Sequence, residues 1–316
     1  MTEVFLAGIG FALGEIRETL EEAAAAGLLS CEAAALSEAG FRFHHRSAPR
    51  TTAYDLALRA ARAIPEGTRE IDVVLYATCL PCNGNLGSDE DFQRTRDVKT
   101  IMDFPGSHLQ ADLGLESASV IGLNQQACTG LLGALRVGRA LMAAEPETER
   151  ALCLTADRFP EGALYSQSYN LISDGAAACI LSRSGGDYRL LASHARTSGA
   201  LARAADEEVA GTYFAHTHRL IHETLAKAGL AIGDVDWFVA QNMNHKALEI
   251  LARLLPLDPA RIVAPTLPEI GHVISGDNLI NLKCLTERGA IQKGQKVLMA
   301  MAGYGLNWQC AILEKT

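Results

Sequence analysis

Two stretches of this chain repeat the same order of elements, and this repeat limits the fold more than any other feature. Residues 51–79 have the pattern of a helix, a turn with Asp72 and an apolar strand, and residues 219–242 have the pattern of a helix, a turn with Asp236 and an apolar strand. Helical periodicity alternates with short β-rich runs, which favours helices packed on a largely buried sheet. We therefore expect an α/β fold that contains one unit twice.

A second pair of segments supports this duplication. Residues 149–158 and 294–305 each have the pattern of a strand after a polar turn, and the offsets of roughly 145 to 165 residues indicate two similar halves. At 316 residues and 48% hydrophobic, the chain can bury a large core. No linker rich in Pro, Gly or Ser divides it, so we expect halves at residues 1–180 and 181–316 that share this core.

The charge balance excludes several kinds of partner. The net charge of −9 argues against nucleic acid and anionic membranes, because binding to either requires clustered Lys and Arg. Residues 1–16 have no basic leader, and no run reaches the roughly 18 uncharged apolar residues of a membrane-spanning helix. The eight cysteines are scattered through apolar segments, which is typical of reduced thiols. We expect a soluble, cytoplasmic protein.

Cys128 stands between a strand-like run and an apolar helix. SASVIGLN precedes it, and TGLLGALRVGRALMAA follows with small and aliphatic residues that suggest a helix buried on nearly all sides. Unpaired amides at the start of that helix would stabilise a thiolate and lower the pKa of Cys128. The alternative is a small core residue without chemistry, because most buried cysteines serve packing alone.

Five segments add a resemblance to this local pattern. They are NQQACTGLLGALRVG, NLISDGAAACILS, VDWFVAQNMNHKAL, EIGHVISGDNLINL and MAGYGLNWQCAIL. In this order they resemble the β-ketoacyl-acyl-carrier-protein synthase III family of the thiolase superfamily, which the chain also matches in length. The resemblance implies a thiolase fold, with duplicated βαβαβαββ halves in a five-layered α-β-α-β-α arrangement. It also implies a homodimer that uses acyl thioesters as substrates and needs no cofactor.

The resemblance assigns the acyl-accepting nucleophile to Cys128. The backbone amide of Cys128, with that of Gly305 or Tyr304, would form the oxyanion hole for the tetrahedral intermediate of acyl transfer. Cys79 lies in a loop close to the acyl pocket of the family. His108 lies in the region that caps the substrate tunnel, often from the dimer partner. We treat both as pocket candidates rather than as catalysts.

The chain departs from the family in the residues that face the cysteine. The family places a His and an Asn there, which together stabilise the enolate formed by decarboxylation of a malonyl unit. Gln241 occupies the His position, Asn244 matches the final Asn of the same motif, and His272 stands where the other loop has its Asn. Asp277 could orient the His272 imidazole, or it could cap a helix that starts at Asn278.

A Cys and a His suffice for nucleophilic acyl transfer. His272 can take the thiol proton of Cys128 and then activate an acceptor hydroxyl, amine or carbon acid, whereas Gln241 and Asn244 can orient a carbonyl but cannot remove a proton. We favour an acyltransferase of fatty-acid-like or specialised-metabolite biosynthesis. The alternatives are a decarboxylative β-ketoacyl synthase and a non-catalytic partner subunit of an active synthase.

The acyl donor stays open between an acyl carrier protein and coenzyme A. The region that binds coenzyme A in members of the family has no Trp in this chain, although Arg42 and Arg46 could contact its phosphates. Candidates for a basic patch that meets a carrier protein are, by residue type only, Lys246, Arg253 and Arg139.

Two further motifs are set aside. CLPC at 79–82 reads as a loop rather than a redox pair. His218 and His222 stand four residues apart without a third ligand, so we expect no metal site.

Overall fold

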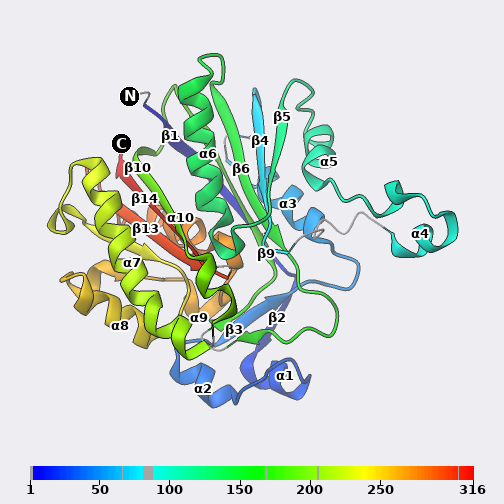
Figure 1. Ribbon diagram of the computed structural model, residues 1–316, viewed down its shortest axis with the longest axis horizontal. Coiled ribbons are helices and arrows are strands. Elements are labelled where there is room, and N and C mark those ends of the chain that lie inside the picture. Colours follow the sequence, from blue (N-terminus) through cyan, green and yellow to red (C-terminus); the bar gives the residue numbers. More distant parts are fainter. Residues whose placement is uncertain (1–2, 66, 81–87, 168–169, 205, 305) are drawn as a thin grey trace.

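The computed structural model describes residues 3–65, 67–80, 88–167, 170–204, 206–304 and 306–316. Within these ranges, ten strands form one sheet in the order β12-β11-β13-β14-β10-β1-β9-β6-β4-β5 (Figure 1). The strands of this sheet are β1 (Phe5–Leu13), β4 (Val73–Ala77), β5 (Ser119–Leu123), β6 (Arg150–Asp157), β9 (Gly175–Ser182), β10 (Tyr188–Thr197), β11 (Trp237–Ala240), β12 (Ile262–Val263), β13 (Lys296–Gly303) and β14 (Asn307–Lys315).

Helices and two small two-stranded sheets surround the main sheet. The helices are α1 (Leu20–Ala25), α2 (Ala33–Glu38), α3 (Ala53–Arg62), α4 (Asp89–Thr95), α5 (Pro105–Asp112), α6 (Gly130–Ala144), α7 (Asp206–Ala228), α8 (His245–Leu254), α9 (Leu267–Ile270) and α10 (Asp277–Glu287). The small sheets pair β2 (Ile16–Thr19) with β3 (Phe43–Arg46) and β7 (Ser166–Gln167) with β8 (Asn170–Leu171).

The strand order is the same in both halves of the sheet. If the five strands of each half are numbered along the chain, both halves have the order third, second, fourth, fifth, first. The halves join through β1 and β10, where Phe5 pairs with Arg189 and Leu6 with Tyr188. The last strand of the first half ends at Ser182. This order supports our proposal that the chain divides into duplicated halves, residues 1–180 and 181–316.

The two aspartates of the sequence repeat have the same structural role. Asp72 precedes β4, and its carboxylate accepts hydrogen bonds from the amides of Glu149 and Arg150 at 2.8 and 2.9 Å, where β6 begins. Asp236 precedes β11, and its carboxylate accepts a hydrogen bond from the amide of Lys296 at 2.8 Å, where β13 begins. Each aspartate therefore fixes the register of two neighbouring parallel strands.

Three apolar clusters stack the elements into five layers. One cluster lies between α3, α5 and the first half of the sheet, and another lies between α7, α8 and the second half. The third contains residues of α6 and α10 together with strands of both halves, so these two helices form the central layer. This is the α-β-α-β-α arrangement of the thiolase fold, and it confirms the expected fold class.

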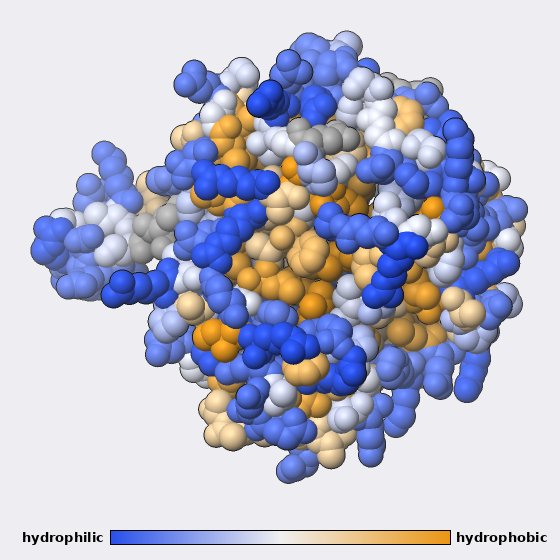
Figure 2. Space-filling view, turned by 180° about the vertical axis from the view of Figure 1, so that it is seen from behind, coloured by the Kyte–Doolittle hydropathy of each residue, from blue (hydrophilic) through white to orange (hydrophobic). Residues whose placement is uncertain are grey.

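Helix α6 is less enclosed than the sequence suggested. Among the described residues, Ala127–Ala144 is the one stretch long and apolar enough to span a membrane, and half of it is buried inside the protein. Arg136, Ala140 and Ala143 are exposed, because α6 lies at the open side of the central layer (Figure 1). The expectation of a helix buried on nearly all sides is therefore wrong. The opposite side of the molecule has apolar residues gathered near its centre, with hydrophilic residues around them (Figure 2).

Candidate active site

Cys128 lies in a short 3-10 turn, Ala127–Thr129, between the end of β5 and the start of α6. The turn is tightly held: Ser275 donates a hydrogen bond to the carbonyl oxygen of Ala127 at 2.9 Å, and the Thr129 hydroxyl donates to the carbonyl oxygen of Gln126 at 2.6 Å. Ala127 has a positive φ of 44°, a conformation that is uncommon for a residue with a Cβ. The tertiary contacts thus fix the position of the thiol.

His272 reaches Cys128 from a different part of the chain. Its Nε2 lies 3.4 Å from the Cys128 Sγ, and its side chain is almost fully buried. The preceding Gly271 has φ +62°, and a Cβ on it would lie 2.6 Å from the carbonyl oxygen of Leu171. The His272 amide donates to that same oxygen at 2.7 Å. Glycine before His272 therefore permits the close approach that aims the imidazole at the thiol.

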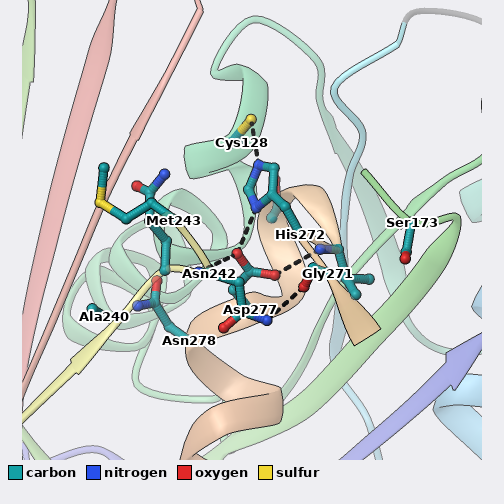
Figure 3. A network of polar contacts seen from close by, with 12 residues as sticks. Cys128, Ser173, Ala240, Asn242, Met243, Gly271, His272, Asp277 and Asn278 are labelled. Atoms are coloured by element: carbon teal, nitrogen blue, oxygen red, sulfur yellow. Dashed lines mark hydrogen bonds and ion pairs between the residues drawn. The ribbon is translucent and has the colours of Figure 1, made fainter. Parts of the chain in front are cut away.

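Asp277 completes a line of three side chains (Figure 3). Its Oδ2 lies 2.5 Å from the Nδ1 of His272, and both side chains are buried. The Asp277 carboxylate also accepts hydrogen bonds from the amides of Val273 and Asn242, each at 2.7 Å. A carboxylate at Nδ1 holds the proton there and leaves the Nε2 lone pair facing the sulfur.

The structure distinguishes the two roles considered for Asp277. Helix α10 begins at Asp277 itself, its N-cap residue is Gly276, and no side chain caps it. The capping alternative is therefore wrong, and the carboxylate contacts the imidazole.

Sequence reasoning missed Asn242, which supports His272 and Asp277 through hydrogen bonds. Its side-chain amide donates to the Gly271 carbonyl oxygen at 2.6 Å, and its Oδ1 accepts a hydrogen bond from Asn281 at 2.8 Å. Asn242 thus holds both the loop before His272 and, through its own amide, the Asp277 carboxylate. The only signal in the sequence was its place directly after Gln241 in the altered motif.

The pKa of Cys128 is raised rather than lowered. A hydrogen bond with the Cys79 thiol and the burial of the sulfur both favour the neutral thiol. The expected fall in the pKa of Cys128 is therefore wrong. At neutral pH the resting form is the thiol, and attack requires a base that removes its proton. His272 is the base within reach.

A cavity of about 590 Å³ opens onto Cys128. Its walls combine apolar residues with side-chain amides and hydroxyls. The other residues that line it are Cys79, Leu80, Asn124, Gln125, Ala127, Phe159, Gln167, Ile172, Thr197, Ile274, Tyr304 and Asn307. Cys79 and Tyr304, which the resemblance gave as candidates, thus line the same cavity as Cys128. Gly305, the other oxyanion candidate, and Cys82 of the CLPC motif lie outside the described residues.

Three other candidates have different surroundings. The Oε1 of Gln241 accepts a hydrogen bond from the Ala302 amide at 2.8 Å, and the Oδ1 of Asn244 caps α8 by accepting from the Ala247 amide at 2.9 Å. His108 is exposed on α5, where its ring packs edge-on to Tyr54. Within one chain, none of the three lines the cavity.

The cationic candidates do not form one patch. Arg42 pairs with Glu269, and Arg46 pairs with Glu18 at 2.8 Å, so both have carboxylate partners. Lys246 and Arg253 lie on the outer helix α8, whereas Arg139 lies on the central helix α6.

Across the described part of the chain, no group of three or more His, Cys, Asp or Glu side chains is placed to hold a metal ion. His218 and His222 contact each other on α7, with ring centroids 4.3 Å apart. The seven cysteines whose positions are described are free thiols.

Comparison with known proteins places the fold and the site in a class. Two family models match: 3-oxoacyl-[acyl-carrier-protein] synthase III over residues 124–199, and the C-terminal domain of the same synthase over residues 225–315. Together they span more than half of the chain. They describe enzymes that transfer acyl groups on a thiolase fold.

Relatives and solved structures agree with this class. The β-ketoacyl-[acyl-carrier-protein] synthase III of Rhodospirillum rubrum is 25% identical over 304 residues, which cover 87% of this chain and 88% of that protein. The acyltransferase ChlB3 has a similar structure, with a TM-score of 0.83 and 23% identity over 99% of this chain and 98% of that chain. The synthase III of Pseudomonas aeruginosa PAO1 gives a TM-score of 0.79 and 22% identity over 99% and 98%.

The chain therefore belongs to the β-ketoacyl-acyl-carrier-protein synthase III family of the thiolase superfamily, as a divergent member. Enzymes of this family act on acyl thioesters.

Proposed function

We propose that this protein is an acyltransferase that takes an acyl group from a thioester onto Cys128 and passes it to an acceptor nucleophile. The observation that carries the proposal is the line Cys128–His272–Asp277, with successive contacts of 3.4 and 2.5 Å. Nucleophile, base and orienting carboxylate in that order are the parts needed for covalent acyl transfer.

The first half-reaction loads the enzyme. His272 Nε2 takes the thiol proton as the Cys128 sulfur attacks the thioester carbonyl, and the Asp277 carboxylate stabilises the imidazolium that forms. The oxyanion of the tetrahedral intermediate accepts hydrogen bonds from the Cys128 amide and from the backbone at Tyr304 or Gly305. The carrier thiol leaves with the proton from His272.

The second half-reaction repeats these steps with the acceptor. His272 removes the proton of an alcohol or amine, which attacks the acyl-Cys128 carbonyl, and the proton returns to the cysteine sulfur as the ester or amide leaves. A carbon acid as acceptor would use the same base.

Transfer to oxygen or nitrogen is favoured over decarboxylative condensation. Condensation of a malonyl unit needs two donors on its enolate, but neither Gln241 nor Asn244 is among the residues that line the cavity at Cys128. His272, in contrast, contacts Cys128 directly. An acyl carrier protein or coenzyme A as donor, a homodimer and a cytoplasmic location remain part of this proposal.

Intact-protein mass spectrometry tests the proposal. The protein is incubated with acetyl, malonyl and longer acyl thioesters of both carriers, as wild type, Cys128→Ala and the matched control Cys31→Ala, which removes an exposed thiol. We expect wild type and Cys31→Ala to gain the mass of one acyl group, with a malonyl carboxyl retained, and Cys128→Ala to gain none.

The other outcomes identify the alternatives. Loss of carbon dioxide from a malonyl donor would establish the condensing enzyme instead. No mass gain with any donor would overturn the acyltransferase and favour the partner subunit.

A further inference from the structure

A second cavity, of about 670 Å³, lies apart from the catalytic one. Helices α6 and α7 both pack on β10 (Figure 1). The residues that line the cavity come from these three elements. Its charged and polar lining comes from Arg136 and Arg139 of α6, Lys227 of α7 and Ser193 of β10. It shares no lining residue with the cavity at Cys128, and its two arginines lie two to three helical turns beyond that residue.

The cations of this cavity have no acidic partner. Among the described residues, no carboxylate pairs with Arg136, Arg139 or Lys227, whereas ten other arginines of this acidic protein do have such partners. Arg136 and Arg139 are three residues apart on α6, so their side chains point to the same face. The cavity therefore concentrates positive charge in a chain whose net charge is −9.

Lys227 contacts a histidine rather than a carboxylate. Its Nζ donates a hydrogen bond to the Nδ1 of His194 at 2.9 Å, and the other ring nitrogen of His194 faces Glu223 at 3.2 Å. Burial and the nearby cations Lys227 and Arg136 lower the pKa of His194, which keeps this ring neutral. Glu223 is already shared with Arg196 and Arg219, so it does not neutralise Lys227.

Arg139 is the most enclosed of the three cations. Burial lowers its pKa, because a guanidinium partly removed from water has lost hydration that nothing else replaces. A bound anion would restore that interaction. The uncharged part of the wall consists of small apolar residues, including Ala140, Ala143 and Leu191, which leave room beside the cations.

We propose that this cavity binds a small organic phosphate, with Arg136, Arg139 and Lys227 around the phosphate oxygens. Two guanidinium groups suit phosphate because each can donate two parallel hydrogen bonds. The Ser193 hydroxyl supplies a further donor, and Ala140 and Leu191 face the apolar body of the ligand. The concave shape favours a small molecule over the flat surface of a partner protein.

Calorimetric titration with pyrophosphate, ADP and adenosine tests the site. The variants are Arg136→Gln and Arg139→Gln, with Arg62→Gln on the outer helix α3 as the matched control. We expect pyrophosphate and ADP to bind wild type and Arg62→Gln, and adenosine not to bind. Each cavity variant should bind at least about tenfold more weakly, because a hydrogen bond to a charged group is lost. The affinity should fall with added salt.

Two results would overturn this site. One is absence of pyrophosphate and ADP binding to wild type at millimolar concentration. The other is equal weakening in Arg62→Gln and Arg139→Gln, which would indicate unspecific attraction. Cys128→Ala should bind these ligands like wild type, so the outcome is independent of the proposed acyl transfer.

Discussion

At the scale of single residues, the proposed acyl transfer depends on which ring nitrogen of His272 carries the proton. Asp277 holds the Nδ1 proton of His272, and the Nε2 of the same ring is therefore free to accept the Cys128 proton. In the proposed acyl transfer, the raised pKa of Cys128 means that proton transfer to His272 accompanies attack of the sulfur. The carboxylate is thus a positioning group with a direct effect on rate.

Replacement of Asp277 by Asn keeps the shape of the side chain and removes its charge. In Asp277→Asn, we expect acylation of Cys128 to slow by about 10²- to 10⁴-fold, because the amide no longer stabilises the imidazolium or the correct tautomer. Single-turnover loading followed by mass spectrometry measures this rate. The control Asp187→Asn removes an exposed ion pair with Lys315 and should load at the wild-type rate. Equal rates in both variants would remove Asp277 from the mechanism.

The contact between the two thiols predicts a pH effect. The Cys128 thiol donates a hydrogen bond to the Cys79 sulfur, which favours the protonated form of Cys128, so Cys79→Ala should lower the Cys128 pKa. The midpoint of iodoacetamide alkylation at Cys128, followed against pH by peptide mass spectrometry, should then move to lower pH. Alkylation of the exposed Cys31 provides the internal reference. An unchanged or higher midpoint would show that the Cys79 contact does not hold the proton.

At the scale of elements, the catalytic turn depends on a strand of the other half. A Cβ on Gly303, at the end of β13, would lie 2.6 Å from the Cys128 amide nitrogen and 3.0 Å from the Ala127 Cβ. Only a residue without a side chain lets β13 pass this close to the nucleophile. The position of Cys128 is therefore decided jointly by β13 and the turn before α6.

A single methyl group should disturb this contact. Gly303→Ala keeps every reacting group, but the strand or the turn must move, at a cost of about 1–3 kcal/mol in the free energy of unfolding. We expect acylation to slow at least about tenfold, because the thiol and its amide shift relative to His272. Gly233→Ala is the control, since no atom lies within 4 Å of its added Cβ. Normal acylation by Gly303→Ala would show that the turn tolerates displacement.

At the scale of the whole molecule, one core joins the two halves. The central cluster contains Leu135 of α6, Leu282 of α10, Leu75 of β4 and Met299 of β13, all buried. Neither half encloses this apolar surface alone. We therefore expect the halves to unfold together.

Unfolding of a core variant tests this expectation. Leu135→Ala should lower the free energy of unfolding by about 2–5 kcal/mol, and the exposed Leu254→Ala by less than about 0.5 kcal/mol. Both tryptophans, Trp237 and Trp308, lie in the second half, whereas far-UV circular dichroism reports on both halves. In Leu135→Ala, the two signals should shift together in one transition. Separate transitions would mean that the halves are independent units.

The sequence by itself predicted the duplicated fold and singled out Cys128 and His272, which the structure brings into contact. The repeats around Asp72 and Asp236 predict two similar units because periodicity and turn residues are local properties, and the structure gives both aspartates the same bonds. Cys128 and His272 were found by the match of short motifs. Those motifs could not tell whether Asp277 orients the ring or caps a helix, since both roles use the same residue type at the same spacing.

Only the tertiary structure decided how these residues work. The direction of the Cys128 pKa shift depends on Cys79, which is far from it in sequence, and on burial. Gln241 and Asn244 stand at the positions of the family motif, but their side-chain oxygens accept hydrogen bonds from backbone amides. The apolar helical pattern did not indicate that α6 has an open face that carries Arg136 and Arg139. Proton affinity, access and charge pairing are set by neighbours brought together by folding, and local sequence does not encode them.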